Sequence, residues 1–293
     1  MGRSIGILAT RYIWVGMVDG TKLGSVRMFP EPGQGEIDLK SIPWEGMVEE
    51  ILKEVEFLHR GEPIDSVGAG IPGIVRNGVC DDSPNLAQLK GTNIRESLTT
   101  ALKSAGIDAP VTILNDADAL AAGIGATQGM LEKLIRVWYL GDGVGFGRYP
   151  RNDSVGEGGH MVVTLDPKEH YCGCGGVGHL EGIMGNRAMR LRFLDMEPEE
   201  VFALARQGDS RADNFVHRWH RALAAATATH VHMEGPGRFY LAGPNTDFVE
   251  INLLNRYLQD MVKMSPLQGT YFEIVPTSHD LALIGAAVSS RAK

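Results

Sequence analysis

The most diagnostic stretch of the chain reads Gly156-Glu-Gly-Gly-His160 and continues, ten residues later, as His170-Tyr-Cys-Gly-Cys-Gly-Gly-Val-Gly-His-Leu-Glu181. Four of its side chains are ordinary metal ligands: His160, Cys172, Cys174 and His179. Zinc in structural sites takes four nitrogen or sulfur ligands in a closed tetrahedron. The stretch therefore predicts a loop closed by a metal ion. Glu157 and Glu181 lie at its two ends, where they are placed to hold a polar ligand.

The composition is that of an ordinary soluble globular protein. The chain has 293 residues, of which 43% are hydrophobic and 22% charged, and its net charge is -8. This acidic balance disfavours a nucleic-acid partner, and the absence of a long apolar run disfavours a membrane span. The first residues lack the pattern of a secretory signal, and the three cysteines (Cys80, Cys172 and Cys174) fit a reducing compartment, so we expect a cytoplasmic protein.

Apolar periodicity and turn signals predict alternating strands and helices along the chain. Strands are expected at 4–8, 13–18, 23–29, 66–71, 111–114, 135–140, 161–165, 239–242 and 272–275. Helices are expected at 44–59, 93–104, from 116 to about 126, over much of 185–233, at 248–264 and at 280–291. This alternation is typical of an α/β fold with mostly parallel sheets.

The order of a strand meander followed by strand and helix occurs twice, once near the start and once after residue 135. It predicts two similar lobes with a cleft between them. We expect an N-terminal lobe of residues 1–116 plus 280–293 and a C-terminal lobe of residues 117–279 that carries the metal loop.

Several motifs together resemble the ROK family, which comprises repressors, open reading frames and sugar kinases. The matching segments are Gly68-Ala-Gly-Ile-Pro-Gly73, Ser83-Pro-Asn-Leu86, Leu114-Asn-Asp-Ala-Asp-Ala119, Leu140-Gly-Asp-Gly-Val-Gly145, Gly156-Glu-Gly-Gly-His-Met161 and Cys172-Gly-Cys-Gly-Gly-Val-Gly-His-Leu-Glu181. In the last of these, His179 replaces a cysteine of the family pattern. The resemblance implies the actin/hexokinase fold, which is ribonuclease H-like, with two α/β lobes closing on a sugar and a nucleotide.

By this resemblance, a hexose would be bound by Asn85, Asn115, Asp116, Glu157, His160 and Glu181. Asp116 stands at the position of the general base, which takes the proton of the sugar's primary hydroxyl during phosphoryl transfer. Side chains of Asn, Asp and Glu suit a sugar because each hydroxyl both donates and accepts hydrogen bonds. Taken alone, Asn115-Asp116 after a strand is also a helix cap.

The resemblance also implies that the metal is a structural zinc ion held by His160, Cys172, Cys174 and His179. His160 would then bind zinc with one ring nitrogen and the sugar with the other. The alternative is that zinc has been lost and that glycine-rich packing holds the loop. His217 and His220 lie one helical turn apart, and without a third ligand they are interpreted as surface or packing residues.

The nucleotide motifs depart from the family pattern. The family's D-x-G-G-T hairpin reads Ile7-Leu-Ala-Thr-Arg-Tyr12 here, with neither the aspartate nor the glycine pair. Asp142 replaces a threonine of the phosphate loop, and the adenosine segment Leu241-Ala-Gly-Pro-Asn245 keeps one glycine. The positions that correspond to nucleotide contacts are Gly141, Asp142, Gly143, Gly145 and Gly243. ATP and Mg²⁺ are expected only if the kinase activity is retained.

Two functions compete on these grounds. The first is an ATP-dependent hexokinase or glucokinase-type enzyme with Asp116 as base. The second is a sugar-binding homologue without kinase activity: a sensor, a scaffold or an enzyme with altered sugar chemistry. A third possibility is glycoside chemistry by Asp116 paired with Glu157 or Glu181, which depends on the separation of the carboxylates. A DNA-binding repressor is disfavoured because the chain begins at its first strand. The family resemblance suggests a homodimer.

Overall fold

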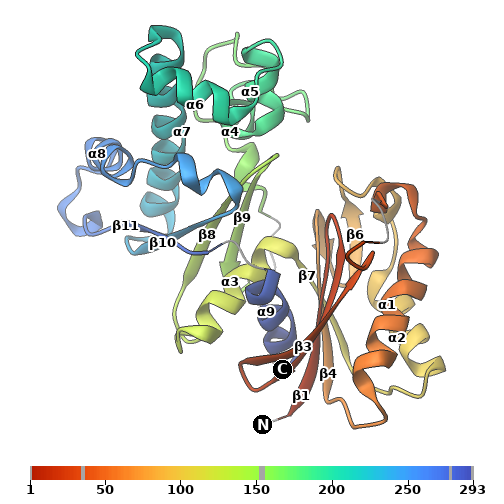
Figure 1. Cartoon of the computed structure of the whole chain (residues 1–293). Helices are drawn as coiled ribbons and strands as arrows, with labels where there is room; N and C mark the ends of the chain where they lie inside the picture. Colours follow the sequence, from red (N-terminus) through yellow and green to blue (C-terminus); the bar gives the residue numbers. More distant parts are fainter. Residues whose placement is uncertain (1, 34–36, 152–155, 277–278, 292–293) are drawn as a thin grey trace. The chain divides into compact units, whose positions relative to one another are not determined.

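The computed structural model describes residues 2–33, 37–151, 156–276 and 279–291 (Figure 1). The chain groups into two compact units. The first contains Met1–Ile135, Gly147–Val155 and Ser278–Lys293, and the second contains Arg136–Phe146 and Gly156–Thr277. The first unit thus extends past residue 116, where the sequence placed the boundary, because helix α3 (Asp116–Thr127) packs against α9 (His279–Arg291).

The sheet of the first unit has the strand order β3-β2-β1-β4-β7. The strands are β1 (Arg3–Ala9), β2 (Ile13–Asp19), β3 (Lys22–Phe29), β4 (Ser66–Ile71) and β7 (Val111–Asn115). The first three form an antiparallel meander, whereas β4 pairs in parallel with both β1 and β7. A separate hairpin joins β5 (Ile74–Arg76) to β6 (Val79–Asp82), which sequence patterns did not predict.

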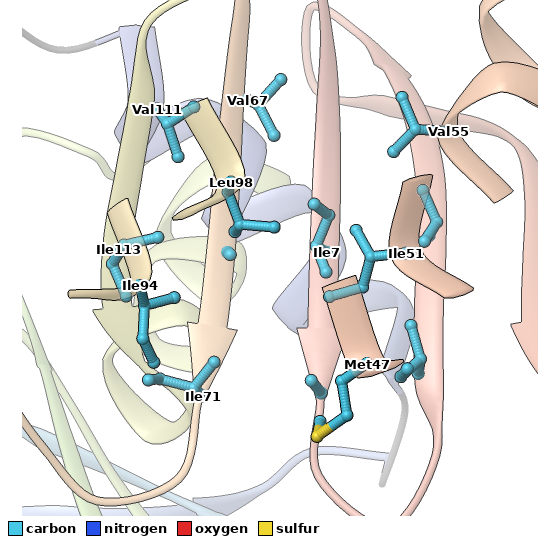
Figure 2. Close-up of a cluster of buried hydrophobic side chains, with 14 of the residues drawn as sticks. Ile7, Met47, Ile51, Val55, Val67, Ile71, Ile94, Leu98, Val111 and Ile113 are labelled. Atoms are coloured by element: carbon cyan, nitrogen blue, oxygen red, sulfur yellow. The ribbon is translucent and has the colours of Figure 1, made fainter. Parts of the chain in front are cut away.

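Helices α1 (Trp44–His59) and α2 (Ile94–Ser104) cover one face of this sheet. Figure 2 shows side chains of α1 and α2 facing strand residues such as Ile7, Ile71 and Ile113. In α1 the buried residues Met47, Ile51 and Val55 are spaced four apart, which keeps them on one side of a helix. The spacing that predicted helix 44–59 is therefore the spacing that fills this core.

Helices α3 and α9 cover the opposite face, and two glycines allow their close approach. A Cβ atom at Gly68 of β4 would lie 1.9 Å from the Ala286 carbonyl oxygen of α9. A Cβ atom at Gly123 of α3 would lie 1.8 Å from the Leu281 carbonyl oxygen. No side chain tolerates such distances, so backbone packs directly on backbone here.

The second unit has a sheet with the strand order β11-β10-β8-β9. Its strands are β8 (Ile135–Leu140), β9 (Val144–Tyr149), β10 (Arg238–Ala242) and β11 (Tyr271–Ile274). β10 runs parallel to both β8 and β11. Its helices are α4 (Glu181–Met184), α5 (Asn186–Arg192), α6 (Pro198–Arg206), α7 (Ser210–Glu234) and α8 (Ile251–Met261). Short 3-10 turns in the chain are η1 (Leu39–Ser41), η2 (Ala87–Leu89), η3 (Gly158–His160), η4 (Pro244–Phe248) and η5 (Ser265–Leu267).

The long helix α7 runs through the core of this unit. Its Trp219 and Leu223 are fully buried, and its Thr227 hydroxyl accepts a hydrogen bond from Trp138 Nε1 at 3.1 Å. His220 of α7 is also fully buried. Its Nδ1 donates to the Val216 carbonyl at 2.8 Å, and its Nε2 accepts from the Glu250 amide at 2.9 Å at the start of α8. The packing role foreseen for His220 is confirmed.

The strand expected at 161–165 was wrong. This apolar segment forms only an isolated bridge between Val162 and His179, and Leu165 is 92% exposed. The segment is held by the neighbouring loop rather than by a sheet, since the Val163 amide donates to the Gly178 carbonyl at 2.8 Å. Among the described residues, no helix is long and apolar enough to cross a membrane.

Candidate functional site

The N-terminus of α3 carries the first set of polar residues. The Asn115 side chain caps this helix, because its Oδ1 accepts a hydrogen bond from the Ala117 amide at 2.8 Å. Its Nδ2 donates to the Gly73 carbonyl at 3.0 Å. The cap that the sequence allowed is therefore present, and it fixes where Asp116 begins the helix.

Asp116 is half-buried at the first position of α3. Burial raises the pKa of its carboxyl above the ordinary value, while the amide hydrogen bond from Ala117 at 3.0 Å works in the opposite direction. An aspartate with a raised pKa is a better proton acceptor than an ordinary one. The geometry is thus compatible with a general base at this position.

Asp118 is a residue of this region that sequence reasoning missed. Burial raises the pKa of its carboxyl to about 6, although the Arg148 amide donates to its Oδ1 at 2.9 Å and the Arg151 guanidinium lies near. Arg151 is itself held by the carbonyls of Val75 at 2.7 Å and Ile113 at 3.1 Å. A signal was present in the sequence: the family segment that Leu114–Ala119 resembles reads N-D-A-N-A, and Asp118 stands where its second asparagine would be.

Asn85 lies exposed in the turn after β6, in the same unit. Ser83 fixes this turn, because its hydroxyl donates to the Pro72 carbonyl at 2.9 Å and accepts from the Leu86 amide at 3.3 Å. Gly73, whose carbonyl accepts from Asn115, follows Pro72 directly. The structure therefore ties the turn that carries Asn85 to the cap that carries Asp116.

The second unit gathers the predicted metal ligands. His160 Nδ1 lies 3.4 Å from Cys172 Sγ, the two cysteine sulfurs are 3.4 Å apart, and Cys174 Sγ lies 3.2 Å from His179 Nδ1. All four ligand atoms are within 4.8 Å of one another. Zn–S and Zn–N bond lengths place the corners of a tetrahedron roughly 3.3–3.8 Å apart. The donor set fits a zinc ion, with His179 in place of the family's cysteine.

A metal ion at this position would have to displace the proton of a buried thiol, Cys172. Burial raises the pKa of its thiol to about 12, with contributions from the neighbouring Cys174 and Glu181. A thiol in this environment ionises only when a cation stabilises the thiolate, and metal binding displaces its proton. A zinc ion would supply a structural cross-link between η3 and the Cys172–His179 loop. His160 turns its Nδ1 toward the cluster, so a sugar would contact this side chain through Nε2.

Glu181, at the start of α4, connects this cluster to the loop after β8. Its Oε2 accepts from the Val144 amide at 3.1 Å, and its Oε1 accepts from Cys172 Sγ at 3.7 Å. A Cβ atom at Gly143 would lie only 2.5 Å from Oε2, so the glycine leaves room for the carboxylate. Glu157 is exposed just before η3, and its carbonyl accepts from the His160 amide at 3.0 Å.

The predicted nucleotide positions of this unit lie in the loop after β8, directly after β10, and within β9. Gly141 and Gly243 follow the parallel strands β8 and β10, and Asn245 Nδ2 donates to the Gly141 carbonyl at 3.3 Å. Asp142 is exposed and accepts from Asn186 Nδ2 at 3.2 Å, whereas Gly143 lies against Glu181. Gly145 lies within β9. Sequence reasoning missed Asn186 and Asn245, whose amides bond to each other at 2.7 Å.

The hairpin between β1 and β2 in the first unit is closed by bulky residues. Leu8 is buried, and the Thr10 amide donates to the Tyr12 carbonyl at 3.1 Å. Trp14 stacks on His279 with the ring centroids 3.6 Å apart. This hairpin offers no carboxylate to Mg²⁺, so the family's metal-binding role does not fit Ile7–Tyr12.

Comparisons with known proteins agree with this arrangement. The sequence profile of the ROK family matches residues 37–292. A glucokinase of Pyrobaculum calidifontis is 28% identical over 255 residues, which cover 80% of this chain and 82% of that protein. An N-acetylmannosamine kinase of Haemophilus influenzae is 27% identical over 290 residues, which cover 92% of each chain.

The fold is shared as well. A ROK hexokinase from Thermus thermophilus superimposes with a TM-score of 0.78 at 25% identity, covering 98% of this chain and 97% of that one. The α/β class and the two-lobed actin/hexokinase type expected from the sequence are confirmed by this likeness.

Proposed function

Because this chain belongs to the ROK family, we propose that it is a sugar kinase that uses ATP to phosphorylate the primary hydroxyl of a hexose. Asp116 accepts the hydroxyl proton while the sugar oxygen attacks the γ-phosphorus. The new bond joins this oxygen to phosphorus, the bond from phosphorus to the β–γ bridging oxygen breaks, and ADP leaves. Magnesium enters with ATP as part of the substrate complex.

The observation that carries this proposal is the environment of Asp116. The carboxylate is placed by a capped helix start and half-buried, and its raised pKa favours proton acceptance. Asn85 stands in the turn tied to the same cap and offers an amide to sugar hydroxyls. In phosphoryl transfer, a carboxylate that orients the nucleophile is the main chemical contribution of the protein.

The second unit supports sugar binding independently of ATP. Glu157, His160 and Glu181 offer two carboxylates and one ring nitrogen next to the Cys–His cluster. The zinc ion that we propose for this cluster would fix the orientation of His160 and hold the segment before Glu181. Hexose or N-acetylhexosamine are the substrate classes that the relatives' names suggest.

The lack of a carboxylate in the Ile7–Tyr12 hairpin favours a second candidate, a sugar-binding protein without kinase activity. The hairpin has lost the family's anionic Mg²⁺ ligand, and Asp142 adds an anion where the family has a threonine hydroxyl. An anion facing a phosphate group is repulsive unless a cation lies between them. A sugar sensor, or an enzyme with altered sugar chemistry, would tolerate both changes.

Calorimetry distinguishes the two functions. The wild-type protein is titrated with glucose and with N-acetylmannosamine, and then with a non-hydrolysable ATP analogue and Mg²⁺ in the presence and absence of the sugar. The kinase proposal predicts heat from both ligands and product formation with ATP. Sugar binding without any nucleotide heat would establish the second candidate instead.

The Asp116→Asn variant tests the role of the base. We expect phosphoryl transfer to fall by about 10²–10⁴-fold, because a positioned base contributes about that much. Hexose affinity should change little, since the amide keeps one acceptor oxygen for the Ala117 amide. Asp108→Asn, at a largely exposed position of the same unit, is the matched control. Loss of sugar binding in Asp116→Asn would show that Asp116 is first a ligand residue.

A further inference from the structure

Glu169 is a buried carboxylate that stands outside the ROK motifs. Its side chain is 4% exposed and receives two guanidinium groups. Arg192 donates Nη1 to Oε1 at 3.1 Å and Nη2 to Oε2 at 2.6 Å, and Arg218 pairs with Oε1. A bidentate pair of this kind fixes the orientation as well as the position of both side chains.

Arg192 also contacts the far end of the same loop. It is the last residue of α5, and its side chain is 12% exposed. Its Nη2 donates to the Gly182 carbonyl at 3.2 Å, and its guanidinium carbon lies 4.2 Å from the centre of the Tyr171 ring. One side chain therefore touches the loop at Glu169, Tyr171 and Gly182.

The loop between these contacts carries most of the candidate site of the second unit. Cys172, Cys174, His179 and Glu181 all lie between Glu169 and Gly182. The backbone closes the loop as well, since the Gly178 amide donates to the Glu169 carbonyl at 2.7 Å. Loss of the Arg192 side chain therefore removes one contact at each end of the segment that presents three of the four metal-ligand atoms.

We propose that Glu169 and Arg192 are positioning residues that clasp the loop, so that the affinity of the Cys–His cluster for zinc depends on a salt bridge that touches no ligand atom. Through Glu181 the clasp also sets sugar affinity, and this second consequence rests on the proposed function. Because Arg192 is nearly buried, neutralising Glu169 leaves its charge poorly compensated, and the side chain has to leave its place to reach water.

The test compares Glu169→Gln with Glu197→Gln in the full-length protein. Glu197, which caps α6, pairs with Arg190 of α5 at 2.7 Å, but both side chains are exposed, so it is the matched control. Zinc affinity is measured by competition with a chromophoric chelator. We expect about a tenfold loss or more in Glu169→Gln, as for other residues that support metal ligands, and no change in Glu197→Gln.

Conservative variants separate positioning from simple loss of folding. Glu169→Asp keeps the charge and should recover part of the zinc affinity. Arg192→Lys keeps the charge but loses the bidentate pair and should weaken zinc binding even if Glu169→Gln does not fold. For the sugar, the clasp predicts an increased KM in both weakened variants, with kcat less affected.

Wild-type zinc affinity in folded Glu169→Gln and Arg192→Lys would overturn the proposal, as would a wild-type protein that takes up no zinc. The metal measurement needs neither ATP nor turnover. A protein that proves not to be a kinase therefore still shows the clasp through its zinc affinity, and failure of the proposed function is distinguishable from failure of this inference.

Discussion

Asp118 stands where the family pattern has an asparagine. This half-buried position therefore carries a carboxyl group instead of an amide. The neighbouring Asp116 was predicted as the base from its motif, because the motif's family pattern marks that position. Asp118 and Glu169 were not found from the sequence. Their properties come from burial and from arginines distant in the sequence, such as Arg151 and Arg192, which no local pattern reveals.

The raised pKa of Asp118 predicts a pH-dependent effect of Asp118→Asn. A carboxyl whose pKa rises from 3.8 to about 6 on folding binds more protons in the native state than in the unfolded state between these values. Native stability is therefore lost as the pH rises through this window. The variant lacks that loss and should be more stable than the wild type by about 3 kcal/mol at about pH 8, with little difference near pH 4.

Urea unfolding at both pH values, followed by hydrogen exchange in α3, measures this difference. Asparagine keeps an oxygen that accepts the hydrogen bond from the Arg148 amide. The substitution therefore removes the titrating group and leaves this hydrogen bond in place. Asp108→Asn, at a largely exposed site, should show no such pH dependence. An equal effect of Asp118→Asn at both pH values would contradict the raised pKa.

At the scale of elements, several ranges predicted from the sequence agree closely with the helices and strands of the structure. The expected ranges 44–59 and 66–71 agree with α1 and β4. Burial on one face sets the spacing of apolar residues in α1, whereas β4 is buried along its whole length. The segment 161–165 has equally apolar residues but no sheet partner, so its composition was misleading. The hairpin of β5 and β6 was missed because its strands are shorter than a periodic signal requires.

The contact between α3 and α9 depends on the absence of a side chain at Gly123. Gly123→Ala introduces a Cβ atom 1.8 Å from the Leu281 carbonyl oxygen, so α9 has to move away from α3. We expect a loss of about 3 kcal/mol in the stability of the first unit, at the upper end of the usual cost of overpacking. Chemical denaturation with hydrogen exchange in β1 and β4 measures it.

Gly24→Ala in β3 is the control for this substitution. A Cβ atom at Gly24 meets the Met17 carbonyl oxygen at 3.4 Å, an ordinary contact, and alanine costs less backbone entropy than glycine on folding. Its stability should be unchanged or slightly higher. If Gly123→Ala is as stable as Gly24→Ala, the two helices do not pack as closely as described.

For the whole molecule, the alternation of elements predicted the class and the division into two units, but not the border between them. The border moves to Ile135 because α3 packs on α9, and a contact between residues so distant in the sequence leaves no local signal. Each unit has its own hydrophobic cluster. The Cys–His cluster lies entirely in the second, so a bound metal stabilises the two units unequally.

Chelation should therefore lower the stability of the second unit selectively. A ligand present at a thousand times its Kd stabilises the folded state by about 4 kcal/mol, and removing zinc loses a comparable amount. Hydrogen exchange with and without a zinc chelator should show faster exchange in α7 and β10, whereas α1 and β4 stay protected. Cys172→Ser should exchange like the chelated protein without chelator. Equal loss in both units would indicate that the metal is not where we propose it.

The close packing of α9 against Gly68 and Gly123 affects the order in which the two units fold during translation. The chain leaves the first unit at Ile135, returns to it at Gly147–Val155, and returns again with α9 after the rest of the second unit. The second unit can complete its sheet while the first still exposes a backbone-lined groove along β1 and β4. During translation, the first unit is therefore begun before the second unit but completed after it, because α9 is made only after the second unit.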